Sequence, residues 1–575
     1  MTGQMAARAQ LALAGGLGGF LIWAVFRAHD RDWIGDYPAL ILFGTIATLF
    51  GALLGMAGPI GLLRSLPRAA LLAVAVGALL ALTMLRYANA EDFVRAGLPV
   101  LATVAVASLP VPFLITGARS GWRDYPALFL EAWSVVLRFA AAMAFTGLVW
   151  LVIYLSDAVL NIVGLDVIGR LLKHEVVPLV LTGAVLGLGM AVIHDLADLL
   201  SPYVVLRLFR LFLPVVLAVM AVFLVALPFR GFDGLAGGLS PAMLLLTMVA
   251  GGIALVSIAV DQSDADATQS PLLVRSAQGM ALVLPVLAGL ALWAIWLRVD
   301  ERGWSPDRVF VMLVAGIGVA YGLIYAVAVL RGAGWMGRIR QGNIMMALAL
   351  IVLAALWLTP VLNAERISAR DQLARFASGR TPVERLDVAA LQSWGKPGAA
   401  AMAELEALAK EPGQEALAAV LAGDAPAPGV DRDALVAGLR AAMPVQPVTA
   451  TGTRDTLLYS AEDYMLQDWT QVCAADLTPG EPGCLMVVAD LLPTMPGEEG
   501  LLFLRRSADY VEVTGLYIGQ DGKLRLRGTT RPDGGYFSAA ETLALMRQYR
   551  DTPPPVTAAM LNQLGTGDTG LIILP

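Results

Sequence analysis

Charged side chains are scarce in this chain of 575 residues: Asp, Glu, Lys and Arg make up 15% of it, against 58% apolar residues. Soluble domains carry about 25% charged residues, so this shortage excludes an ordinary water-soluble protein. Histidine is also rare. The three histidines, His29, His174 and His194, are too few for a dense metal cluster, and we expect no metal and no cofactor.

The motifs of common catalytic and nucleotide sites are missing as well. The chain has no Walker A loop, no Gly-x-Ser-x-Gly elbow, no His-Glu-x-x-His, no haem-binding Cys-x-x-Cys-His and no dinucleotide glycine fingerprint. We therefore do not expect ATP-driven transport by this chain alone, and a non-enzymatic role is favoured. A lipid-directed transferase remains an alternative, because such enzymes need only a few polar residues at loop ends.

What the chain does contain is a series of apolar segments, over roughly its first 360 residues, each about long enough to cross a bilayer. Prolines such as Pro241 and Pro306 stand at helix starts, and arginines such as Arg86 stand at helix ends, where they can reach lipid headgroups. An interfacial helix fits the stretch from Asp157 to Lys173. We predict eleven transmembrane helices, near residues 10–27, 38–58, 69–86, 98–116, 133–155, 176–195, 204–229, 240–260, 277–298, 309–330 and 343–362.

The remainder is acidic, with 27 acidic and 18 basic side chains from Val361 to Pro575, so we expect no nucleic-acid partner. The predicted fold class is an all-α membrane bundle followed by a smaller extracytoplasmic α+β domain. Its expected parts are the bundle over 1–362, a helical linker over 363–445 that continues the last span, and the α+β domain over 446–575. In the last part we expect a hairpin of 511–518 with 523–528, helices near 538–549 and 555–563, and a strand over 570–574.

The two cysteines bear on orientation, since positive charges are almost equally divided between the two membrane sides. Cys473 and Cys484 both lie in the tail, and ten residues rich in Pro and Gly separate them. A disulfide between them requires an oxidising compartment, and two unrelated buried thiols are the alternative. An odd number of spans with a cytoplasmic N-terminus also places the tail outside, so we predict an extracytoplasmic tail.

Three segments resemble a known family. They are NAERISARDQLARFASGR from Asn363, LDVAALQSWGKPGAAAMAEL with its Trp394-Gly395-x-Pro397-Gly398 element, and RVDERGWSPDRVF from Arg298. These segments resemble the "domain of unknown function 4153" family. The resemblance covers the late spans and the entry to the tail, and it implies a multi-pass protein of the bacterial inner membrane with a periplasmic C-terminal domain. It supplies no catalytic residues.

Ionisable residues within spans are costly and often functional. Glu131 and Arg138 are seven residues apart, on one helix face, and each is a candidate for a polar interior. His194 and Asp198 are an i,i+4 pair that can relay protons or bind a metal, although interfacial solvation at the end of a span explains them more simply. Arg207 with Arg210 is a further candidate pair.

A short repeat supports a second alternative. The pentapeptide DYPAL occurs at Asp36 and again at Asp124, each time where a span opens, and an offset of three spans makes an inverted repeat as in many transporters. A good helix start at an interface explains the same residues without common ancestry. Glycine pairs, such as Gly15/Gly19, Gly51/Gly55 and Gly183/Gly187, indicate close helix packing.

Taken together, the residues favour a non-enzymatic envelope protein whose tail binds a partner or substrate. Its expected partners are membrane lipids and another envelope protein. The alternatives are a secondary transporter and a lipid-directed transferase.

Overall fold

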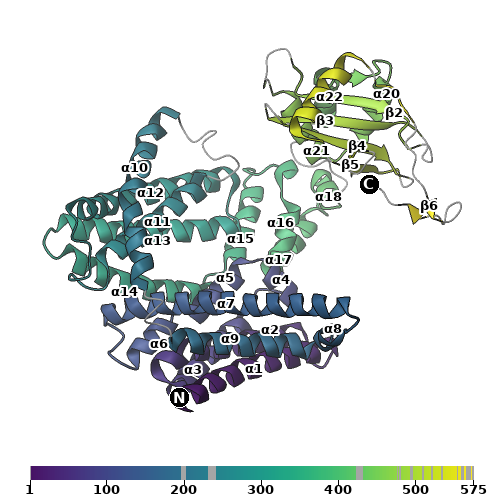
Figure 1. Ribbon diagram of the computed structural model, residues 1–575. Coiled ribbons are helices and arrows are strands. Elements are labelled where there is room, and N and C mark those ends of the chain that lie inside the picture. The colour runs from purple at the N-terminus through teal and green to yellow at the C-terminus, as the bar shows by residue number, and fades with distance from the viewer. Residues whose placement is uncertain are drawn as a thin grey trace. The chain divides into compact units, whose positions relative to one another are not determined.

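The computed structural model describes residues 2–195, 202–230, 241–422, 432–475, 477, 481–492, 497–507, 510–519, 522–531, 535, 537–552, 554–557, 563–564 and 571–572. The chain divides into two compact units, Met1–Ala418 and Ala419–Pro575 (Figure 1). The helices that follow the last span therefore belong with the membrane bundle, where the sequence predicted a separate linker.

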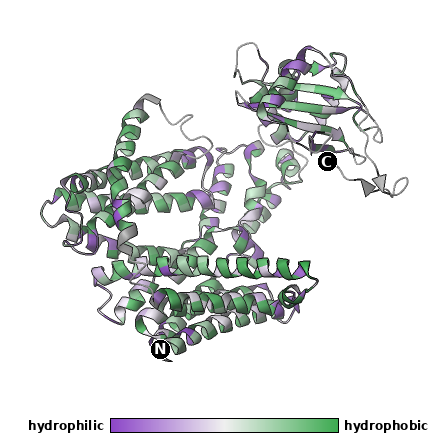
Figure 2. Ribbon diagram, in the orientation of Figure 1, coloured by the Kyte–Doolittle hydropathy of each residue, from purple (hydrophilic) through white to green (hydrophobic). Residues whose placement is uncertain are grey.

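Within the described residues, eleven helical segments are long and apolar enough to cross a membrane, as predicted. The green of hydrophobic residues dominates the long helices in Figure 2. Ten spans are single helices: α1 (Thr2–Asp30), α2 (Asp36–Ile60), α3 (Leu62–Thr83), α7 (Tyr125–Ile162), α9 (Val176–Asp195), α10 (Pro202–Arg230), α11 (Pro241–Val260), α12 (Pro271–Arg302), α13 (Pro306–Leu330) and α14 (Trp335–Trp357). The fourth span is made of α5 (Leu98–Ser108) and α6 (Val111–Gly117), and the short helices between spans are α4 (Ala90–Arg95) and α8 (Val167–Leu172).

Glycine governs the packing of α1 against α9. A Cβ added to Gly15 would lie 2.0 Å from the carbonyl oxygen of Gly183, and one added to Gly183 would lie 2.1 Å from the carbonyl oxygen of Gly15. Because real Cβ atoms do not approach this closely, only glycine permits the contact. The predicted packing role holds for Gly15 and Gly183. It does not hold for Gly51, where an added Cβ would meet no atom within 4 Å.

The apolar core of the first unit has two main parts. One is formed by α10 to α14 and includes Leu284, Ala288 and Tyr325, all fully buried. The other joins α1, α2, α3, α6, α7 and α9 around side chains such as Met56. A third cluster includes the fully buried Tyr87, and it contains residues of α3, of α14 and of the chain that follows α14.

The last span ends earlier than predicted and does not continue into the next helix. Helix α14 ends at Trp357, and α15 (Ala364–Ala377) begins after a turn that contains Pro360. Asn363 caps α15 by accepting a hydrogen bond from the backbone N–H of Arg366 at 2.9 Å. The cap starts a new helix, so the predicted continuity was wrong. The unit continues with η1 (Val383–Arg385), α16 (Val388–Ser393) and α17 (Gly395–Leu408), and α18 (Glu415–Ala422) extends across its boundary.

The second unit is an α+β domain around a five-stranded sheet in order β1-β2-β3-β4-β5. Strand β1 (Val445–Gln446) pairs parallel with β2 (Cys484–Ala489), and β3 (Glu499–Ser507), β4 (Tyr510–Ile518) and β5 (Leu524–Gly528) follow antiparallel. Helices α19 (Arg432–Ala442), α20 (Thr451–Ser460) and α21 (Asp463–Cys473) pack against one face, and α22 (Ala539–Asp551) packs against the other.

The pleat of β2 explains these two layers. Met486 and Val488 contact the three-helix layer, whereas Leu485 and Val487 contact Met546 of α22. The predicted hairpin of 511–518 with 523–528 and the helix near 538–549 are confirmed by β4, β5 and α22. The final apolar strand was expected to cover this sheet. Instead, β7 (Leu571–Ile572) pairs with β6 (Gln563–Leu564) in a separate two-stranded sheet.

Candidate functional site

A buried ion pair joins the chain just after α3 to the first turn of α15. The Arg86 guanidinium is fully buried and donates through Nη2 to Glu365 Oε2 at 2.5 Å, and through Nη1 to the backbone oxygen of Trp357. The hydroxyl of Tyr87 donates to the other oxygen of the Glu365 carboxylate. A buried charge is tolerated only when it is paired and hydrogen-bonded, as here. Arg86 therefore does not reach lipid headgroups, contrary to the sequence prediction.

Tyr87 stays a hydrogen-bond donor because of its surroundings. Burial, together with the nearby Glu365 charge, raises the pKa of the Tyr87 phenol well above its usual range. The phenol therefore remains protonated at any physiological pH and supplies its proton to the carboxylate.

Helix α15 also closes the end of α12. The Arg375 guanidinium donates to the backbone oxygens of Asp300 and Glu301, both at 2.9 Å. These carbonyls belong to the last turn of α12, where no further backbone N–H can bind them. Gln372 donates to the carbonyls of Arg302 and Trp304, and Asp371 accepts from the Trp304 N–H at 2.7 Å.

Two glycines with positive φ allow these close approaches. A Cβ on Gly303 (φ 76°) would lie 2.6 to 2.7 Å from the side chains of α15, and one on Gly395 (φ 57°) would lie 2.7 Å from the Arg86 carbonyl oxygen. Next to Gly395, Lys396 donates its backbone N–H to the same Arg86 oxygen at 2.8 Å and its ammonium to the Met84 oxygen at 2.7 Å.

The three segments that resemble the known family thus meet in one place. We call this place the exit junction, and it consists of Arg86, Tyr87, Gly303, Glu365, Asp371, Gln372, Arg375, Gly395 and Lys396. Its bonds hold the first helices after the last span against the ends of α3 and α12. Sequence reasoning did not pair these residues, and the one signal available was their occurrence in the three resembling segments.

A second polar region lies where α10, α11 and α12 meet the loop 261–270. This region, the loop pocket, has a volume of about 650 Å³, and its polar lining is Arg207, Arg210, Asp261, Asp266, Thr268 and Gln269. Arg210 pairs with the buried Asp261 carboxylate and donates to the carbonyls of Ile258 and Asp266 at 3.0 Å. Hydrogen bonds from Ser263 and Gln262 lower the pKa of Asp266, which therefore stays ionised.

Arg207 differs from Arg210, its predicted companion. Its side chain is exposed in the pocket wall, and no hydrogen bond or ion pair of its guanidinium is present within the described part of the chain. The loop itself is fixed by Arg340 of α14, which donates to the Asp261 and Val260 carbonyls and to the Asp264 carboxylate.

One helical turn away, a polar network crosses four spans. Tyr325 of α13 donates to the side-chain oxygen of Asn343 at 2.6 Å, and its hydroxyl lies 2.8 Å from that of Ser257. Asn343 in turn donates to the Tyr125 hydroxyl at 3.0 Å. Ser257 precedes Asp261 by four residues and Asn343 follows Arg340 by three, so the network adjoins the loop pocket.

Of the predicted intramembrane residues, Glu131 and Arg138 are brought together. Arg138 Nη2 donates to Glu131 Oε2 at 3.2 Å, and Arg119 donates to the other Glu131 oxygen at 3.0 Å. The Glu131 carboxylate is thus shared between two guanidiniums, and it ties the chain after α6 to α7.

The other predicted pair is only partly described. The imidazole of His194 lies against Gly58 of α2, where an added Cβ would be 2.8 Å from the ring. Asp198 lies outside the described residues, so the proposed His194–Asp198 pair stays a prediction.

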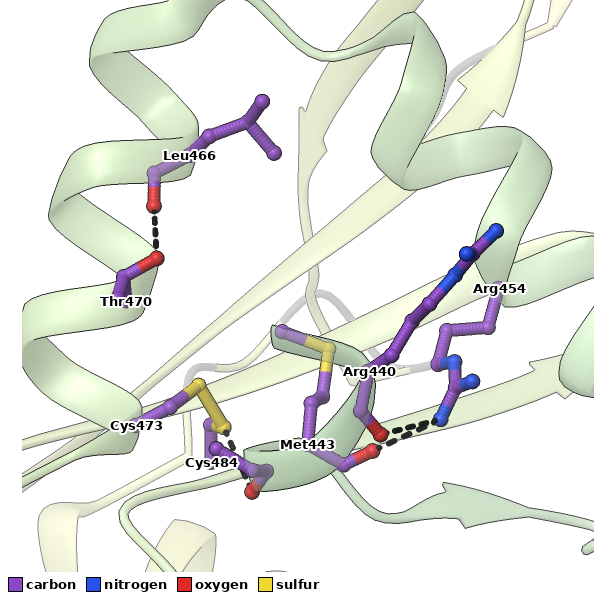
Figure 3. Close-up of a disulfide and its surroundings, with 8 residues drawn as sticks. Arg440, Met443, Arg454, Leu466, Thr470, Cys473 and Cys484 are labelled. Atoms are coloured by element: carbon purple, nitrogen blue, oxygen red, sulfur yellow. Dashed lines mark hydrogen bonds between the residues drawn. A yellow bond between two sulfur atoms is a disulfide. The ribbon is translucent and has the colours of Figure 1, made fainter. Parts of the chain in front are cut away.

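The cysteines of the tail are joined. A disulfide links Cys473 at the end of α21 to Cys484 at the start of β2, with Cα atoms 4.9 Å apart (Figure 3). Beside it, Arg454 donates to the carbonyls of Arg440 and Met443 at the end of α19. The disulfide fixes α21 to the sheet, and this arginine joins α20 to the end of α19 within the helical layer.

Searches against protein-family models, curated proteins and solved structures each returned no match. The resemblance drawn from the three segments therefore remains a prediction.

Proposed function

We propose that the protein is a non-enzymatic protein of the bacterial inner membrane whose periplasmic tail binds another envelope protein. The exit junction carries this proposal. A buried ion pair and side-chain caps hold the helices from α15 through α17 against the membrane bundle. This arrangement suits a bundle that anchors the tail domain.

The disulfide and the number of spans support the location of the tail. Disulfides such as Cys473–Cys484 persist in oxidising compartments, which for a bacterial inner-membrane protein means the periplasm. The eleven candidate spans among the described residues are an odd number, which puts the segments before the first span and after the last on opposite membrane sides. The N-terminus then lies in the cytoplasm and the tail in the periplasm.

The corner between α20 and α21 is the tail surface that we favour for a protein partner. Tyr464 is 63% exposed, and Tyr459 is exposed as well. Arg432 fixes the corner by pairing with Asp463 and donating to the Tyr459 carbonyl at 2.6 Å. Exposed tyrosines on a fixed backbone are common at the centres of protein interfaces.

Site-specific photo-crosslinking in living cells tests this function. A photoreactive residue at Tyr464 should give one discrete protein adduct, and the same residue at Tyr510, which is 51% exposed on β4, should give none. Equal labelling at both positions, or no protein adduct at Tyr464, would contradict the proposal.

Reporter fusions test the topology separately. A phosphatase that is active only in the periplasm should be active when fused after Gly398 and inactive within the loop 261–270. The reverse result would invert the topology and place the tail in the cytoplasm.

The loop pocket favours a secondary transporter as a second candidate. An arginine-lined opening adjoins a polar network inside the spans, as expected along a substrate path. If the protein is a transporter, a membrane-impermeant thiol reagent should react with the cysteine of Ser257→Cys when it is added to either side of the membrane. Reaction from one side alone, or none, favours the anchoring function. Ala281→Cys, fully buried in α12, is the control.

A further inference from the structure

An apolar groove lies between α13, α14 and the start of α15. Its volume is about 560 Å³, within the range of about 300–1,000 Å³ that is usual for ligand pockets. Its lining is almost entirely apolar and includes small residues such as Gly316, Ala320 and Ala349 beside Met312 and Leu353. Because these residues on neighbouring spans are small, their side chains do not fill the space between the helices, and the groove remains open.

The groove runs from the membrane interior to the exit end of the bundle. Most of its lining belongs to α13 and α14, which are spans, so hydrocarbon surrounds it. Trp304 and Ile367 line its other end, where the chain leaves the membrane, and tryptophan is typical of that interface. A Cβ added to Gly316 would meet no atom within 4 Å, so this part of the groove has free space.

The exit end of the groove carries unpaired positive charge. Arg366 and Arg370 of α15 flank the groove residue Ile367, and both are exposed. Within the described residues neither guanidinium has a hydrogen bond or an ion pair. The acidic residues of α15 are already engaged, because Glu365 binds Arg86 and Asp371 binds the Trp304 N–H.

We propose that this groove binds an acyl chain of an anionic phospholipid, with the lipid phosphate held by Arg366 and Arg370. The apolar channel matches the chain, and the two arginines at its interfacial end match the headgroup. The site differs from ordinary lipid contact because it selects the headgroup and confines one chain. This binding is independent of the partner proposed for the tail.

Native mass spectrometry of the full-length protein tests the headgroup. Palmitoyl-oleoyl phosphatidylglycerol should be retained in preference to phosphatidylcholine with the same chains. Arg366→Gln with Arg370→Gln should weaken phosphatidylglycerol retention by about fivefold for each arginine, because a basic residue near a membrane surface contributes about that factor. The matched control is Arg380→Gln with Arg385→Gln, two exposed arginines further along the chain, which should leave retention unchanged.

A second pair of variants tests the channel. Gly316→Leu should occupy the groove and abolish the retained lipid without unfolding the protein, since a Cβ at this position meets no atom within 4 Å. Gly147→Leu, at an exposed glycine of α7 with equally free space, should have no effect. Equal retention of both headgroups, or normal retention in Gly316→Leu, would overturn the proposal.

Discussion

Removing the Glu365 carboxylate should open the exit junction locally. Glu365→Ala deletes the acceptor of both Arg86 and Tyr87. It leaves a fully buried guanidinium whose hydrogen bond within the described residues is the one to the Trp357 carbonyl. Breaking a buried ion pair in this way typically costs about 3–5 kcal/mol. At about 1.4 kcal/mol per factor of ten, the population of the open state should rise by a factor of about 10² to 4 × 10³.

Hydrogen exchange of the full-length protein in lipid nanodiscs measures this opening. Amides of α15 and α17 should exchange faster by that factor, because both helices are held by the junction, while α1 and α9 should be unchanged. Glu91→Ala is the matched control, since Glu91 forms an exposed i,i+4 pair with Arg95, worth at most about 1 kcal/mol.

A double substitution separates the charge from the shape. Arg86→Met with Glu365→Leu removes both charges and keeps apolar volume, so exchange in α15 should recover much of its wild-type rate. If Glu365→Ala leaves exchange in α15 at the level of the Glu91 control, the junction does not hold the helix and the reasoning fails.

Gly183→Leu should prevent the close packing of α1 on α9 and sharply reduce the amount of folded protein in size-exclusion profiles, whereas Gly51→Leu should be tolerated. Equal yields of folded protein from the two variants would contradict the role of the Gly15–Gly183 contact. Serine at Cys473 or Cys484 should destabilise the tail by about 3 kcal/mol, read as a lower calorimetric midpoint of the tail transition, unless both thiols prove free by mass mapping. Hydrogen bonding to Arg547 lowers the pKa of Glu481 in the folded tail. The ionised Glu481 therefore stabilises the tail fully above the ordinary glutamate pKa of about 4.3, and this contribution is lost as the pH falls below that value. Glu481→Gln should flatten the resulting pH dependence of the calorimetric midpoint.

The membrane architecture followed from the sequence because lipid imposes a strong and local requirement. A span needs about 20 apolar residues in a row, and each predicted segment found its helix. The helix ends were less predictable. Helix α14 begins at Trp335, eight residues before the predicted start, because Arg338 and Arg340 within its first turns bind the carbonyls of adjoining chain segments.

The exit junction was beyond prediction from one sequence. Arg86 and Glu365 are 279 positions apart, and nothing in the local pattern of either residue identifies its partner. Arg86 follows an apolar span, as an interfacial arginine does, and Glu365 opens an ordinary helix in the tail. Their pairing depends on the apolar cluster that α3 shares with the end of α14 and the start of α15, which hydropathy does not encode.

The two DYPAL segments show how one local pattern can serve two surroundings. Tyr37, at the start of α2, is buried in the same cluster as Tyr87 and Trp357, beside the exit junction. Tyr125, at the start of α7, accepts the hydrogen bond from Asn343 in the network beside the loop pocket. Spans two and five cross the membrane in opposite directions, so the two motifs open helices on opposite sides. Tyr37 thus packs into an apolar cluster, whereas Tyr125 joins a polar network, whether the repeat arose by duplication or from the requirements of a helix start.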